Sequence, residues 1–172
     1  MYLLSVLTFF MLCGAPTAEA GKLTAATKTA SIDTSRYAIL KFHKGRDSFL
    51  FDSTYTAANT TEDDIKKIEK IIKVTVAEYN ERLLKNTGSK ATKAGLIYKP
   101  DKYYKQIICV INSKGEKTVW VNCFCTPHEK RYWQKGIVMV LDGGPCFFNI
   151  KINLVTNTVM DLQVNGVSPL AP

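Results

Sequence analysis

A chain of 172 residues, 46% of them hydrophobic and 22% charged, is long enough for one domain of ordinary size with its own core. This composition excludes an intrinsically disordered protein. The formal net charge of +8 at pH 7 favours acidic surroundings, which include nucleic acid, anionic lipid, acidic polysaccharide and acidic protein. Solubility alone also explains such a charge, so no class of partner follows from it.

Residues 1–20 have the layout of a cleavable signal peptide. An apolar run over residues 2–12 is followed by Ala18 and Ala20, small residues at the −3 and −1 positions of a cleavage site. The run is too short to span roughly 30 Å of hydrocarbon as a helix, which argues against a retained anchor. Lipidation at Cys13 is an alternative, although a leucine precedes it where a bacterial lipoprotein signal has a small residue. We therefore expect an exported protein, periplasmic or extracellular, with no membrane span in its mature part.

Residues 21–35 are small and polar without any period, and they predict a flexible N-terminal arm. Two short apolar stretches follow at 37–42 and 48–51. The turn residues 44–47 separate them, which predicts a β-hairpin.

The segment from residue 62 to about residue 84 predicts an amphipathic helix. Thr60 or Thr61 can cap it, and three acidic residues follow in the first turn, where they complement the helix dipole. One stripe of the helix carries the apolar residues Ile65, Ile68, Ile72, Val76, Tyr79 and Leu83. This stripe needs an apolar surface to cover, and we expect that surface to be a sheet of the same domain and not a dimer partner.

From residue 105 onward the apolar residues alternate with period two. The pattern predicts five strands, at 107–111, 117–125, 137–141, 147–154 and 159–164, joined by short turns into an antiparallel meander. The fold class is therefore α+β: one long helix on a curved antiparallel sheet of four to five strands, preceded by a short hairpin. This single domain spans residues 36–167, and residues 168–172 form a tail.

The last predicted hairpin can be registered from its apolar pattern. A turn at residues 156–158 pairs Leu154 with Met160, Ile152 with Leu162 and Ile150 with Val164 on the face toward the helix. The polar face then pairs Asn153 with Asp161, Lys151 with Gln163 and Asn149 with Asn165. Asn157 suits the left-handed position that such a turn needs.

Three stretches, at 119–125, 142–154 and 164–166, resemble motifs of small exported bacterial proteins without an established function. The order of elements resembles the cystatin-like or NTF2-like shape. The resemblance covers residues 37–55 and 62–167 and implies the helix-on-sheet fold. It brings no catalytic residue.

Four cysteines lie beyond the predicted signal peptide, an even number that suits disulfide bonds in an exported chain. Cys123 and Cys125 stand two apart on one predicted strand and face the same way, so each would pair with Cys109 or Cys146. Some of the four can instead be small buried core residues. The Cys-x-Cys step near His128 lacks the second ligand pair of a structural zinc site, and we expect neither metal nor cofactor.

Polar side chains dominate one face of the predicted strands. Amides beside an aromatic ring suit sugars or peptides, although such a face can also simply be solvated. The candidate binding residues on it are Trp120, Asn122, Asn149, Lys151, Asn153, Asp161, Gln163 and Asn165. A second candidate is the loop at 128–135, where Trp133 beside Arg131 suits an anionic partner.

No nucleophile elbow, phosphate-binding loop or His-Glu-x-x-His motif occurs. Asp161 beside Lys151 would stay ionised, which makes it a poor general acid. We therefore expect a binding domain without catalytic activity that engages a protein or glycan. Two alternatives stay open: an NTF2-like enzyme or small-ligand carrier with a pocket between helix and sheet, and a polyanion binder that uses the lysines and tyrosines of residues 85–105.

Overall fold

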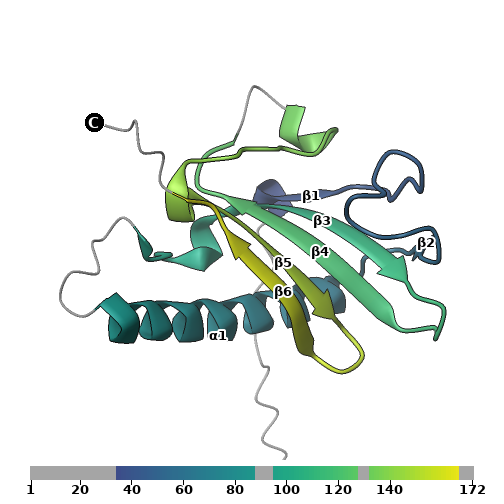
Figure 1. Cartoon of the computed structure of the whole chain (residues 1–172). Helices are drawn as coiled ribbons and strands as arrows, with labels where there is room; N and C mark the ends of the chain where they lie inside the picture. Colours follow the sequence, from purple (N-terminus) through teal and green to yellow (C-terminus); the bar gives the residue numbers. More distant parts are fainter. Residues whose placement is uncertain (1–33, 88–94, 128–131, 167–172) are drawn as a thin grey trace, which may run out of the picture. The chain divides into compact units, whose positions relative to one another are not determined.

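The computed structural model describes residues 34–87, 95–127 and 132–166 (Figure 1). They belong to one compact unit that spans residues 31–172. The predicted signal peptide, nearly all of the predicted arm and the predicted tail lie outside the described residues. No helix among the described residues is long and apolar enough to cross a membrane.

One helix packs against one face of a six-stranded sheet (Figure 1), which confirms the α+β class. The sheet order is β1-β3-β4-β5-β6, and β2 also pairs with β3. Every pair is antiparallel except β1 with β3, which is parallel. The elements are β1 (Tyr37–Ile39), β2 (Thr56–Ala57), α1 (Glu62–Thr87), β3 (Tyr104–Ile111), β4 (Lys117–Phe124), β5 (Phe147–Asn153) and β6 (Thr158–Val164).

Helix α1 begins with a reciprocal cap, as its sequence predicts. The backbone N–H of Asp64 donates to Oγ1 of Thr61 at 3.2 Å, and the N–H of Thr61 donates to Oδ2 of Asp64 at 2.8 Å. Lys117 on β4 adds an ion pair to the same carboxylate oxygen at 2.6 Å. The cap therefore also ties the start of the helix to the sheet.

The apolar stripe of α1 covers the sheet, as predicted. Ile68 and Ile72 are fully buried, and they pack on a face where Ile150, Ile152 and Leu154 are 1%, 0% and 3% exposed. Burial of side chains of this size contributes about 1.5–3 kcal/mol each. The helix–sheet interface is thus the main core of the domain.

The opposite face of the sheet, called here the second face, is also covered, contrary to the expectation of a solvated surface. Residues 38–51 and the segment 132–142, called here the cover segment, pack on it around buried aromatic rings. The rings of Phe124 and Trp133 lie 5.8 Å apart in an edge-to-face contact. The apolar residues of this second core are Ala38, Leu40, Phe42, Leu50, Phe51, Ile108, Val110, Trp120, Phe124, Trp133 and Val138.

The predicted N-terminal hairpin is wrong. Residues 37–39 pair in parallel with β3, and residues 44–50 form turns without strand pairing. Parallel pairing is possible because the long connection from β1 to β3 includes α1. Asp47 closes the turn region, since its buried carboxylate accepts a hydrogen bond from the N–H of His43 at 2.8 Å. Phe42, Leu50 and Phe51 are thereby directed onto the second face.

The predicted register of the β5–β6 hairpin is wrong: the observed pairing is shifted by two residues and also contains a bulge. Ile150 lies opposite Leu162 and Lys151 opposite Asp161, but Ile152 lies opposite Val159, with the irregularity between residues 151 and 152. Asn153 Oδ1 accepts hydrogen bonds from the N–H groups of residues 155 and 156, so the turn begins earlier than predicted. Asn157 does adopt the left-handed conformation, with φ of 58°.

The predicted pairing of Met160 with Leu154 fails because the register is shifted and Leu154 lies in the turn, and the bulge explains why Met160 points to solvent. Val159 and Leu162 both pack on the core although they stand three residues apart, which needs one extra residue between them. Met160 is therefore 51% exposed. Residues 161, 163 and 165 still face away from α1, as predicted, because a shift by two residues keeps the same side chains on each face of the sheet.

Candidate functional site

Side-chain amides bind the cover segment to the second face. Gln106 Oε1 accepts a hydrogen bond from the N–H of Val138 at 2.9 Å, and its Nε2 donates to the carbonyls of Trp133 at 2.5 Å and Gly136 at 2.6 Å. Asn122 Nδ2 donates to the carbonyl of Val138 at 2.8 Å and to Gln106 Oε1 at 3.1 Å. These buried amides supply the partners that a neighbouring strand would otherwise give.

The predicted strand at 137–141 is therefore wrong. Its residues are extended across the second face, but side chains and not a backbone ladder satisfy their polar groups. Asn165 continues the same arrangement, since its Nδ2 donates to the carbonyls of Val140 at 2.5 Å and Asp142 at 3.0 Å. The amides of this face thus recognise the chain's own backbone.

The predicted polar face is consequently only partly open, because the cover segment lies over its Trp120 and Asn122 while Gln163 stays exposed. Trp120 and Trp133 are each 4% exposed and Asn122 is 8% exposed, so the Trp133 loop does not present its ring to an anionic partner. Lys151 lies over the ring of Phe51 at 5.2 Å. Arg131 lies outside the described residues.

The other predicted residues have local roles. Asn153 Nδ2 donates to Glu116 at 3.1 Å besides closing the β5–β6 turn. Gln163 Nε2 donates to Asp161 Oδ2 at 2.9 Å on the exposed side of β6. Trp120 Nε1 donates to Asn149 Oδ1 at 3.3 Å.

Five of the predicted residues do meet in one place, around a small hollow of about 210 Å³ beside the cover segment. Met139 and Leu141 belong to its lining and are 64% and 94% exposed. The five predicted residues in the lining are Trp120, Asn122, Asn149, Gln163 and Asn165. This place, called here the second-face hollow, combines exposed apolar side chains with amides.

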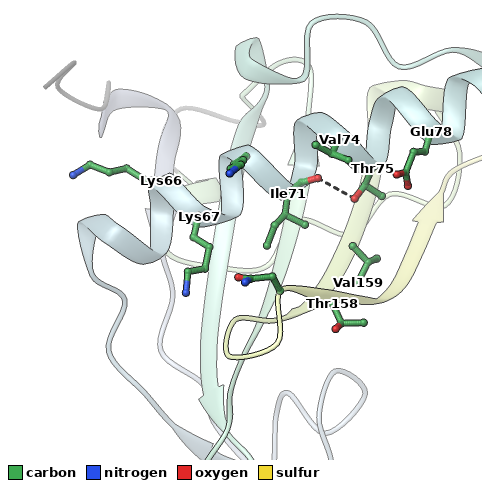
Figure 2. A pocket seen from close by; sticks show the side chains of 10 residues that line it. Lys66, Lys67, Ile71, Val74, Thr75, Glu78, Thr158 and Val159 are labelled. Atoms are coloured by element: carbon green, nitrogen blue, oxygen red, sulfur yellow. Dashed lines mark hydrogen bonds between the residues drawn. The ribbon is translucent and has the colours of Figure 1, made fainter. Parts of the chain in front are cut away.

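A larger concavity lies on the helix side of the sheet, between α1 and the start of β6 (Figure 2). This groove has a volume of about 780 Å³. Its apolar lining comes from Ile71, Val74 and Val159, and Thr75 in its wall donates a hydrogen bond to the carbonyl of Ile71 at 2.9 Å. We refer to it as the α1–β6 groove.

Three lysines stand at one end of the α1–β6 groove. Lys67 reaches the β5–β6 turn and donates to the carbonyl of Leu154 at 3.0 Å, and Lys66 pairs with Asp63 at 3.2 Å on the exposed side. Lys70 forms no ion pair or hydrogen bond within the part of the chain that the structure describes. Glu78 lines the groove roughly 18 Å from Lys66 along the helix axis, as the helical rise per residue requires. The groove is thus cationic at the end near the turn.

Sequence analysis did not identify this groove. The lysines are recognisable as the polar side of the helix, but their nearness to β6 follows from the packing of two distant segments. The one local sign of the groove in the sequence is Val74, an apolar residue on the polar side of the helix, and it is 52% exposed.

Lys105 on β3 does not line the groove, and it is fully buried beneath α1. Its ammonium lies 3.1 Å from Glu69 Oε1, and it donates to the carbonyls of Pro100 at 2.9 Å and Tyr103 at 3.3 Å. The hydroxyl of Tyr37 donates to the same Glu69 oxygen at 2.7 Å. Three acceptors match the three N–H donors of the ammonium, so this group holds α1, β1 and β3 together and is no free nucleophile.

Of the four cysteines, Cys125 and Cys146 form a disulfide bond, with Cα atoms 5.0 Å apart. This bond joins the end of β4 to the start of β5 and closes the loop that contains the cover segment. Cys109 and Cys123 are free and buried on the helix side of the sheet, as small core residues. Burial raises the pKa of the Cys123 thiol to about 12, although Lys105 acts against it. Both predicted roles of cysteine, cross-link and core residue, therefore occur.

The described residues contain no group of three or more His, Cys, Asp and Glu side chains that could hold a metal ion. The α1–β6 groove offers lysines, aliphatic side chains and the carboxylate of Glu78, and the second-face hollow offers amides, aliphatic side chains and the rings of Trp120 and Phe147. The disulfide is compatible with an oxidising compartment outside the cytoplasm. No protein-family model, curated protein or solved structure matches this chain, so the resemblance to cystatin-like and NTF2-like proteins stays a prediction.

Proposed function

We propose that this chain is an exported interaction domain, without catalytic activity, that binds an acidic and extended segment of a partner protein in the α1–β6 groove. The observation that carries the proposal is the groove itself, because aliphatic side chains and a cluster of lysines line one concave surface. Lys70 provides an uncompensated positive charge there, and the net charge of +8 attracts an acidic partner from a distance. Export rests on the predicted signal peptide and the disulfide.

The lining favours a polypeptide over a sugar or a nucleic acid. Sugars and unpaired bases bind proteins largely by stacking on aromatic rings. Ile71, Val74 and Val159 supply aliphatic contacts instead, and no aromatic ring among the described residues lines this groove. The methylene groups of bound glutamate side chains fit such a surface, while their carboxylates meet the lysines.

The alternative functions have weaker support. An NTF2-like pocket between helix and sheet would occupy the space filled by Ile72, Ile107 and Ile150, which are 0%, 0% and 1% exposed. Asp161, which with a tyrosine is the candidate polar group for such a pocket, lies on the second face and not beneath α1. In the polyanion segment 85–105, Lys85 pairs with Glu81 at 2.7 Å and Lys105 is buried against Glu69, whereas Lys90 and Lys93 lie outside the described residues.

A charge-reversal experiment tests the proposal. The probe is a fluorescein-labelled octapeptide of alternating valine and glutamate, and its binding is followed by fluorescence anisotropy at several salt concentrations. We expect Lys70→Glu to weaken binding at least tenfold, because it replaces an attraction by a repulsion. Lys41→Glu is the matched control, because Lys41 is exposed near β1 at the other edge of the sheet and carries the same charge.

Two outcomes would contradict the proposal. Equal losses in the two variants would show that net charge and not the groove attracts the peptide. Tighter binding of heparin or single-stranded DNA than of the peptide, with the same dependence on Lys70, would assign the groove to a polyanion instead.

A further inference from the structure

We propose, resting on the function above, that the partner segment binds as an added β-strand along the outer edge of β6. Its alternate side chains then enter the α1–β6 groove on one side and the second-face hollow on the other. This inference names the binding mode and the side-chain pattern of the partner. Three features of the described residues carry it.

The first feature is the unpaired edge of β6. This strand is the last in the sheet and pairs with β5 alone (Figure 1). Within the described ranges, no other segment forms a backbone hydrogen bond to residues 158–164. Beyond the bulge the strand is regular from Asp161 to Val164, so its outward N–H and C=O groups stand at the spacing that a new strand needs.

The second feature is the position of the two concavities on opposite faces of this one strand. Val159 lines the groove on the helix side, whereas Gln163 and Asn165 line the hollow on the second face. Successive side chains of a β-strand point to opposite faces of the sheet. A strand paired with β6 therefore places odd residues toward one concavity and even residues toward the other.

The third feature is the distribution of charge along the edge. The lysines lie near the start of β6, because Lys67 contacts the carbonyl of Leu154 in the β5–β6 turn. The exposed Met139 and Leu141 lie near its end, where Asn165 binds the cover segment. The partner segment therefore turns acidic side chains toward the lysines of the groove and apolar side chains toward Met139 and Leu141 of the hollow, which is an alternation of acidic and apolar residues.

The experiment compares the valine–glutamate octapeptide with two N-methylated forms, each methylated at one set of alternate residues. An added strand uses the N–H groups of one set only, since the other set points away from β6. We expect one methylated form to bind at least tenfold more weakly and the other to bind within about threefold of the parent. Among residues 161–164, the amides that point away from β5 should also exchange with solvent at least tenfold more slowly in the complex, whereas those bonded to β5 should change little.

The contact between the partner segment and the second-face hollow is tested with Leu141→Ser, because Leu141 lines the hollow and is 94% exposed. We expect it to weaken binding about threefold or more, whereas Phe49→Ser, at a site that is 57% exposed, leaves binding unchanged. Equal binding of both methylated peptides would overturn strand addition while the proposed function stands, provided that Lys70→Glu still weakens binding. Loss of the Lys70 effect as well would overturn both.

Discussion

The side-chain amide of Asn122 donates a hydrogen bond to the backbone carbonyl of Val138 at 2.8 Å, across the boundary between the sheet and the cover segment. Gln106 completes the contact, because its carbonyl oxygen accepts from the N–H of the same valine at 2.9 Å. Both the N–H and the C=O of Val138 are thus hydrogen-bonded, as they would be beside a neighbouring strand. The second face is closed by this contact and by the apolar side chains around it.

Replacement of Gln106 tests how much this contact contributes. Gln106→Met keeps the length of the side chain but leaves the N–H of Val138 and the carbonyls of Trp133 and Gly136 without their partner. Each unsatisfied buried group costs about 1–3 kcal/mol, so we expect the free energy of unfolding to fall by about 3 kcal/mol. Urea unfolding measures it, with the exposed Gln163→Met as control, expected within about 0.5 kcal/mol of the parent. A loss below about 1 kcal/mol would show that water replaces the amide.

The same contact marks a limit of inference from sequence. The strand pattern correctly predicts Asn122 and Gln163 on the face opposite α1, because the alternation is local and a register shift of two residues leaves it unchanged. Whether that face meets water or another segment of the chain is not local. An amide bound to a carbonyl of the cover segment and an amide bound to water leave the same pattern in the sequence.

The strand predicted at 137–141 fails for a related reason. Five successive apolar residues are typical of a buried strand, and Val138 is indeed buried. The neighbouring strand position is missing, however, because β4 pairs directly with β5. The α1–β6 groove was beyond prediction for the same kind of reason, since it depends on how close Lys67 on the helix comes to the turn at Leu154.

Removal of the buried ammonium should destabilise the domain strongly. Lys105→Met leaves the carboxylate of Glu69 without its ionic partner beneath the helix. Breaking one side of a buried pair typically costs about 3–5 kcal/mol, and we expect a loss of that order in urea unfolding. The double variant Lys105→Met with Glu69→Gln should recover at least half of the loss, because the glutamine still accepts from the hydroxyl of Tyr37. Additive losses in the double variant would show that the two charges are not coupled.

Loss of the disulfide should destabilise the loop that carries the cover segment. Cys125 and Cys146 are separated by 21 residues in the sequence. A cross-link over a loop of this length lowers the entropy of the unfolded chain enough to contribute about 3 kcal/mol. We expect the variant with both cysteines replaced by serine to lose about that much in urea unfolding. An unchanged unfolding free energy would indicate that the amide contacts alone hold the loop.

The two free thiols should react only when the protein unfolds. Cys109 and Cys123 are 2% and 0% exposed, and burial raises the pKa of both, that of Cys123 to about 12. The thiolate is the reactive species, so both should resist iodoacetamide at pH 8 in the native state. Mass measurement after labelling of the chain without residues 1–20, which hold the fifth cysteine Cys13, should show no adduct in native protein and two in urea. Adducts in native protein would show that the helix–sheet interface opens.

The cap at the start of α1 should make the free energy of unfolding depend on pH. Burial tends to raise the pKa of Asp64, but hydrogen bonds from Lys117 and Thr61 outweigh it and hold that pKa below its usual value. A lowered folded-state pKa contributes stability above the unfolded value of about 3.9, and the contribution disappears as the pH falls through the folded pKa. We therefore expect Asp64→Asn to be less stable than the parent at pH 7 and the gap to narrow below about pH 4. Urea unfolding at pH 7, 4 and 2 measures the gap, with Asp63→Asn, 91% exposed, as control. A gap that is constant with pH would contradict the assignment of the cap to the charged form of Asp64.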